Sequence, residues 1–92
     1  MTSDEIFTGL ILVTGVSAPK IEESILEILK PFSIKILDKQ CIDIRNRYFL
    51  TILFSLDKAH AKAIELDLNE GAQKLGVDLA IDYQMYKPKN ES

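Results

Sequence analysis

The chain has 92 residues, which is enough for one small domain and too few for two. Hydrophobic residues make up 47% and charged residues 27% of it, a composition that is typical of globular proteins and argues against disorder. A net charge of −3 argues against a general binder of nucleic acid or anionic membranes, because such proteins need a basic surface. We therefore expect small-molecule or protein partners.

Targeting features are missing from the sequence. No apolar run approaches the roughly 18–20 residues that span a bilayer, and acidic residues stand near the N-terminus where a signal peptide carries basic ones. The single cysteine, Cys41, cannot form an internal disulfide, which agrees with a reducing compartment, and we interpret it as an ordinary strand residue. These features predict a cytoplasmic protein.

The first predicted element is a strand over Asp4–Thr14 that ends in the apolar block Leu10–Val13. The small-residue turn Gly15–Pro19 follows and leads directly into a helical pattern. Backbone N–H groups at a helix start lack intrahelical partners, so this junction can receive a carboxylate or a phosphate. The alternative is a tight turn without a ligand, which is common in α/β folds.

The first helix is predicted over Lys20–Lys30, with Pro31 ending it. Acidic residues in its first turn and a lysine at its end complement the helix dipole. Its apolar stripe consists of Ile21, Ile25, Ile28 and Leu29.

A long hairpin is predicted next. Its arms are Ser33–Ile44, with a bulge between Ile36 and Leu37, and Tyr48–Leu56, joined by the polar turn Arg45–Arg47. Both faces of the second arm are apolar, although a sheet with helices on one side should be polar on the other. We therefore expect the second face to meet a dimer partner or another domain.

The second helix is predicted from an N-cap at Asp57 to Leu75, with Gly76 as its stop and Gly71 allowing a close approach or a bend. Its buried stripe is predicted to be Ala61, Ile64, Leu68, Ala72 and Leu75.

The last strand is predicted over Val77–Tyr86, where apolar and polar residues alternate. We thus place one domain at residues 1–86 and interpret residues 87–92 as a tail or the start of a linker. The order strand, helix, strand, strand, helix, strand predicts an α+β ferredoxin-like βαββαβ sandwich. In this fold an antiparallel four-stranded sheet carries two helices on one face.

The sequence contains no recognisable catalytic or metal-binding constellation, and we expect no cofactor. His60 is the only histidine and is interpreted as a solvated helix residue. Asp38 and Asp43 are expected on opposite faces of their strand, which excludes a simple carboxylate pair. The aromatic and basic residues around Arg45–Phe49 are a poor match to an RNA-recognition module, because the chain is acidic and lacks its signature.

Three segments carry a resemblance to a known family. They are Leu12–Val16 with Pro19, the hairpin around Gln40 and Arg45–Arg47, and the closing stretch Leu75–Ile81. Together they resemble an ACT domain, a small regulatory module that binds amino acids. More closely, nearly the whole chain is similar to the N-terminal ACT domain of actinobacterial-type phosphoserine phosphatases.

This resemblance implies that serine or a related amino acid binds between ACT units, against the first loop of one and strand residues of its neighbour. Two positions depart from the family pattern, because Ser17 replaces an acidic residue and Lys20 replaces a glycine. The Lys20 ammonium group can pair with a ligand carboxylate. The implied ligand-binding residues are Gly15, Val16, Ser17, Ala18, Pro19, Lys20 and Asp38.

The resemblance also bears on catalysis. The Asp-x-Asp-x-Thr/Val motif of the phosphatase domain does not occur here, so we expect this chain alone to be non-catalytic. It is then either the regulatory domain of a longer phosphoserine phosphatase of L-serine biosynthesis or a stand-alone ACT protein. The implied partners are an amino-acid effector such as L-serine, a second ACT domain or a homodimer partner, and a phosphatase domain. The alternative is a structural dimerisation or docking module without a ligand.

Overall fold

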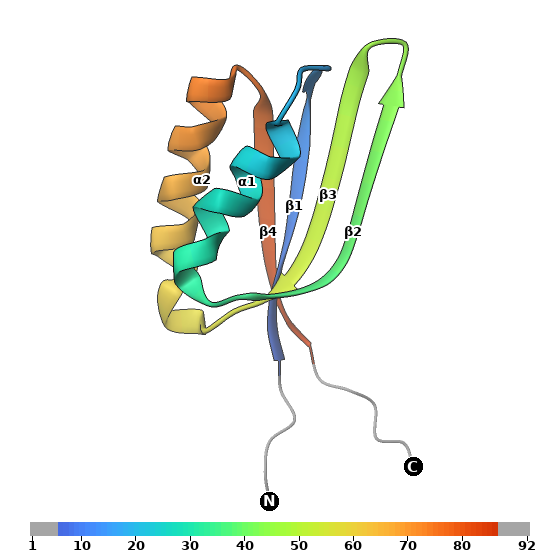
Figure 1. Cartoon of the computed structure of the whole chain (residues 1–92). Coiled ribbons are helices and arrows are strands. Elements are labelled where there is room, and N and C mark those ends of the chain that lie inside the picture. The colour runs from blue at the N-terminus through green and yellow to red at the C-terminus, as the bar shows by residue number, and fades with distance from the viewer. Residues whose placement is uncertain (1–5, 87–92) are drawn as a thin grey trace, which may run out of the picture.

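The computed structural model describes residues 6–86 and confirms the expected fold. Its elements are β1 (Ile6–Val16), α1 (Ile21–Leu29), η1 (Lys30–Phe32), β2 (Lys35–Ile44), β3 (Arg47–Ser55), η2 (Lys58–His60), α2 (Ala61–Leu75) and β4 (Asp78–Tyr86). The four strands form one antiparallel sheet in the order β2-β3-β1-β4. Figure 1 shows both helices on the same face of this sheet. The predicted tail over residues 87–92 lies outside the described residues.

The hydrophobic core fills the space between the helices and the two central strands. Alternate residues of β1 and β3 point to the helices. Each helix packs against them with apolar side chains spaced three or four residues apart. Ile28, predicted to lie on the apolar stripe, is only partly buried, and its side chain lies beside Gly71 of α2. The predicted stripe residues Ala61 and Leu75 are also only partly buried. The largest fully buried side chains are Ile11, Val13, Ile25, Leu29, Leu50, Ile52, Phe54, Ile64 and Leu68.

The turns follow the local sequence. The hairpin between β2 and β3 closes through Arg45 and Asn46, whose φ angles of 48° and 71° fit a two-residue type I′ turn. The register shift between Ile36 and Asp38 confirms the predicted bulge and leaves Leu37 as the extra residue. Gly76 ends α2 with a φ of 72°, in the left-handed region that favours glycine.

Several predicted boundaries are wrong by a few residues. The strand β1 runs two residues past Thr14, because Gly15 and Val16 still pair with β3. The strand β2 begins at Lys35 rather than Ser33, because Ser33 adopts a φ of 54° at the end of η1. The Asp57 carboxylate does act as a cap and accepts the Ala59 N–H at 3.0 Å, but the short η2 turn then separates it from α2.

Candidate functional site

The loop between β1 and α1 is held against the tip of the β2–β3 hairpin. The Ser17 N–H donates to the Asn46 carbonyl at 2.8 Å, and the Ser17 hydroxyl donates to the Asp43 carboxylate at 2.6 Å. Beyond the loop, Glu22 in the first turn of α1 forms an ion pair with Lys39 of β2. The loop is therefore tied through polar contacts to a segment more than 15 residues away in the sequence.

Gly15 and Val16, the first two predicted site residues, belong to the end of β1 rather than to a loop. They pair with Tyr48 and Arg47 of β3. A side chain at Gly15 would come within 3.1 Å of Val77, so the glycine lets β1 pass close to the chain that leaves α2. The loop proper comprises Ser17, Ala18, Pro19 and Lys20.

Lys20 takes the backbone conformation of a glycine. Its φ is 67° and its ψ is 15°, and its carbonyl accepts the Ser24 N–H at 3.0 Å at the start of α1. The helix start therefore has the geometry that a glycine in the resembled family would allow, with a lysine side chain added. That side chain is exposed and makes no capping hydrogen bond.

An open hollow of about 400 Å³ lies beside the loop. It presents one cation, Lys20, close to the acidic first turn of α1. Burial, and then the neighbouring Cys41 side chain, raise the pKa of Tyr48 further above neutral pH, where a phenol is already protonated. The hollow thus combines a cation, carboxylates and a neutral hydroxyl group. Its lining residues are Ala18, Lys20, Ile21, Glu22, Glu23 and Tyr48.

Asp38 lies away from this hollow. It pairs with Leu53 on the sheet face opposite the helices, and its carboxylate accepts the N–H of Lys39 at 2.9 Å. Asp43 points to the helix side, where it meets Ser17, so the expectation that these two aspartates lie on opposite faces is confirmed. Within one chain the structure brings Ser17–Lys20 together and leaves Asp38 apart.

The sequence interpretation missed Asp43 and Tyr48 as neighbours of the loop. The two-residue turn at Arg45 and Asn46 places Asp43 and Tyr48 opposite each other, with both side chains on the helix face. A correct assignment of that turn type would have predicted this pair.

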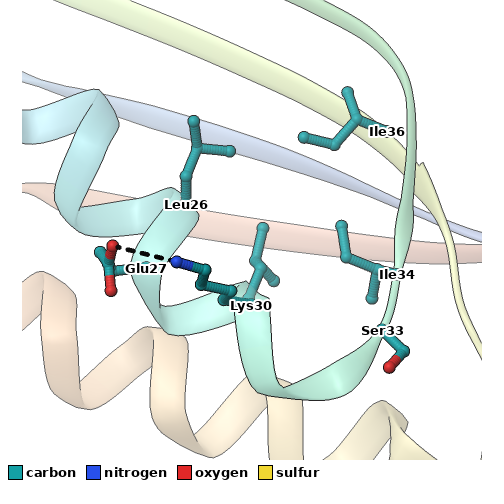
Figure 2. Close-up of a pocket in the computed structure, with 7 residues that line it drawn as sticks. Leu26, Glu27, Lys30, Ser33, Ile34 and Ile36 are labelled. Atoms are coloured by element: carbon teal, nitrogen blue, oxygen red, sulfur yellow. Dashed lines mark ion pairs between the residues drawn. The ribbon is translucent and has the colours of Figure 1, made fainter.

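A second hollow, of about 380 Å³, lies between the C-terminal half of α1 and the start of β2. Figure 2 shows the apolar side chains of Leu26, Ile34 and Ile36 on its walls. The ion pair between Lys30 and Glu27, at 3.9 Å, stands at one side. The hollow is mainly apolar and lies at the other end of α1 from the loop, so it offers little for recognising an amino-acid backbone.

Residues 6–86 hold no group of three or more His, Cys, Asp or Glu side chains arranged to hold a metal ion. Within the same range, no helix combines the length and the apolar character needed to cross a membrane. His60 is exposed and lies 5.9 Å from the Phe32 ring, which agrees with the solvated residue expected.

Comparison with known proteins identifies the family. The sequence profile of the ACT domain matches residues 8–82. The phosphoserine phosphatase SerB2 of Mycobacterium tuberculosis is 32% identical over 75 residues, which are 79% of this chain and 18% of the phosphatase. The chain therefore spans less than a fifth of that relative.

Solved structures share the fold at low sequence identity. An ACT domain protein from Streptococcus pneumoniae has a TM-score of 0.74 at 15% identity, covering 84% of this chain and 89% of that protein. A formyltetrahydrofolate deformylase from Burkholderia mallei has a TM-score of 0.74 at 14% identity, covering 82% of this chain and 27% of the enzyme. A putative glycine cleavage system transcriptional repressor has a TM-score of 0.73 at 16% identity, covering 96% of this chain and 50% of the repressor. The profile match over most of its length shows that this chain belongs to the ACT domain family.

Proposed function

We propose that this ACT domain binds a free amino acid, with L-serine as the first candidate, in the hollow beside Ser17–Lys20. The observation that carries the proposal is the Lys20 ammonium group next to the acidic first turn of α1. A zwitterionic amino acid needs a cation for its carboxylate and an anion for its ammonium group. Glu22 is already paired with Lys39, which leaves Glu23 as the candidate partner for the ligand's ammonium group.

A second ACT domain would complete this site. The strand β2 is an edge of the sheet, and every one of its residues is exposed. A neighbouring domain that paired through this edge would lie beside Lys39 and Asp43, whose side chains point to the helix side with the hollow, whereas Asp38 points to the opposite face. A ligand held between two domains would favour one arrangement of them over another, and that differential binding is what regulation requires.

The regulated partner in this proposal is a phosphoserine phosphatase domain of L-serine biosynthesis, within a longer protein. The relationship to SerB2 supports this part of the proposal. The chain itself would then be the regulatory, non-catalytic part.

Calorimetric titration and light scattering of this chain, with L-serine up to millimolar concentration, test the proposal. We expect binding heat and a dimer that the ligand tightens. Lys20→Gln should weaken binding by about tenfold or more, since a hydrogen bond to a charged group contributes roughly 1.5–3 kcal/mol. The matched control is Lys62→Gln on α2, which is also exposed but does not line the hollow. Absence of both heat and a change in mass would overturn serine sensing.

One observation favours a second function, a structural pairing module without a ligand. The Ser17 hydroxyl, which stands where the family has an acidic group, is already engaged with Asp43. This function predicts a dimer of the same strength with and without L-serine, which the same light-scattering series distinguishes.

A further inference from the structure

The sheet face opposite the helices carries a band of exposed apolar side chains. Leu10 and Leu12 of β1 are 45% and 42% exposed although β1 is a central strand. Figure 1 shows both helices on the other side of the sheet, so neither covers this band. A contiguous apolar surface of this kind is typical of an interaction site. The band consists of the exposed residues Leu10, Leu12, Val16, Ile42 and Ile44, together with the half-buried Phe49 and Leu53 of β3.

Aspartates bound the band on both long sides. The strand register places four residues in one row across the sheet, with Asp38 and Asp82 at its two ends and Leu53 and Leu10 between them. Asp78 lies four residues along β4 from Asp82, on the same face. Among the described residues, the register places two basic residues on this face. Lys35 lies at one end along the strands, and Arg47 lies at the other end, in one row with Ile44 and Val16.

A second copy of this chain fits the face poorly. A two-fold axis along the strands would lay β2 on β4 of the other copy and place Asp38 against Asp82. A two-fold axis across the strands, at the level of Leu12, would lay β4 on β4 and place Asp78 against Asp82. Like charges directly opposite one another are destabilising, so both aligned arrangements are disfavoured.

We infer that this face receives an amphipathic helix of a protein partner, whose apolar stripe is flanked on both sides by Lys or Arg. Asp38 and Asp82 are three strand spacings apart, roughly 14 Å, and a helix with its side chains is about 10–12 Å wide. Asp78 and Asp82 are four strand residues apart, roughly 13 Å, close to the rise of eight or nine helical residues. The partner helix therefore carries basic residues about eight positions apart on one flank and a basic residue on the other.

Binding of such a helix would bury the apolar band and give the sheet a helix layer on each face. The carboxylates would gain partners at the rim of the contact, where charge sets orientation and association rate more than affinity. This surface is separate from the loop that ends in Lys20, which lies on the helix side. The inference therefore stands or falls independently of amino-acid binding.

Two synthetic peptides of 14 residues test the inference, without L-serine present. Both carry the same leucine stripe, one flanked by lysines and the other by glutamates, and each bears a fluorophore for anisotropy measurements. We expect the lysine peptide to bind at least tenfold more tightly, and less tightly as salt is raised. Amide chemical shifts of the labelled protein should change at Leu10, Leu12 and Leu53 rather than in α1 or α2.

Charge variants sharpen the test. Asp78→Asn with Asp82→Asn should weaken the lysine peptide about fivefold or more. The matched control, Asp67→Asn with Glu70→Gln, removes two exposed acids from α2 and should leave binding unchanged. Leu12→Thr, which keeps a good strand former, should also weaken binding. The inference is overturned if the two peptides bind alike, if the α2 control weakens binding equally, or if the protein forms a dimer that buries Leu12.

Discussion

At the scale of single residues, Lys20 has an unfavourable backbone conformation at the start of α1. Its φ of 67° brings the Cβ atom of an L-residue close to the following carbonyl oxygen, which costs roughly 1–2 kcal/mol. The resemblance seen in the sequence implies a glycine at this position in related ACT domains. The position therefore keeps the glycine geometry while presenting an ammonium group to the hollow.

Lys20→Gly should stabilise the fold by about 0.5–1 kcal/mol. Relief of the left-handed conformation outweighs the extra chain entropy that glycine loses on folding, roughly 0.5–1 kcal/mol. The free energy of unfolding in urea measures this change. Lys30→Gly, at a helical φ of −54°, is the matched control and should destabilise by about 1 kcal/mol. Equal losses for both variants would contradict the argument from φ.

At the scale of elements, the two helices touch where α2 has no side chain. A Cβ atom at Gly71 would lie 2.3 Å from the Cδ1 atom of Ile28. Glycine inside a helix costs about 1 kcal/mol of helix stability relative to alanine. The close approach of α1 therefore requires a residue that weakens α2 by itself. Gly71 was predicted to allow a close approach, and the side chain that approaches it is Ile28.

A double-mutant cycle measures this opposition. Gly71→Ala should give little stability, or lose some, in the native chain, because the new methyl group displaces the end of Ile28. In an Ile28→Val background the clashing atom is absent, and the next Ile28 atom is 3.6 Å from the new Cβ, an ordinary contact. There Gly71→Ala should stabilise by about 1 kcal/mol. Additive effects in denaturant unfolding would show that the two residues are uncoupled.

At the scale of the whole molecule, the core lies between the sheet and one helix layer. Leu68 and Leu66 belong to the same helix, yet Leu68 is 0% and Leu66 is 66% exposed. A domain of this length has roughly 5–14 kcal/mol of stability at about 0.05–0.15 kcal/mol per residue. Burial of one large side chain therefore contributes a large share of the free energy of unfolding.

Leu68→Ala should cost about 2–5 kcal/mol, through lost burial and the cavity that remains. Leu66→Ala is the control and should change the free energy of unfolding by less than about 0.5 kcal/mol. Both values follow from urea unfolding monitored by circular dichroism. Similar costs at the two positions would mean that α2 is turned differently on the sheet, or that Leu66 is covered in solution.

Much of the architecture was predictable from local patterns. The spacing of apolar residues predicted both helices, and the break in alternation after Ile36 predicted the bulge. The predicted ends of the elements were less accurate. Pairing with β3 extends β1 to Val16, and the η2 turn capped by Asp57 precedes α2, which begins at Ala61. Of the candidate site, the loop Ser17–Lys20 was predicted in place, whereas its contact with Asp43 was not, since that hydrogen bond spans 26 residues.

The sequence by itself determined the order and type of the elements, because helical and strand periodicities and turn residues act over a few neighbouring positions. It also indicated that the strands carry more apolar residues than one core needs. Only the tertiary structure decided which of these residues stay exposed and which charges stand beside them. Asp38, Asp78 and Asp82 lie at the edges of one apolar band because β2 pairs with β3, β3 with β1, and β1 with β4. Such pairing is set by the cooperative packing of the whole sheet against its helices, which no short stretch of sequence encodes.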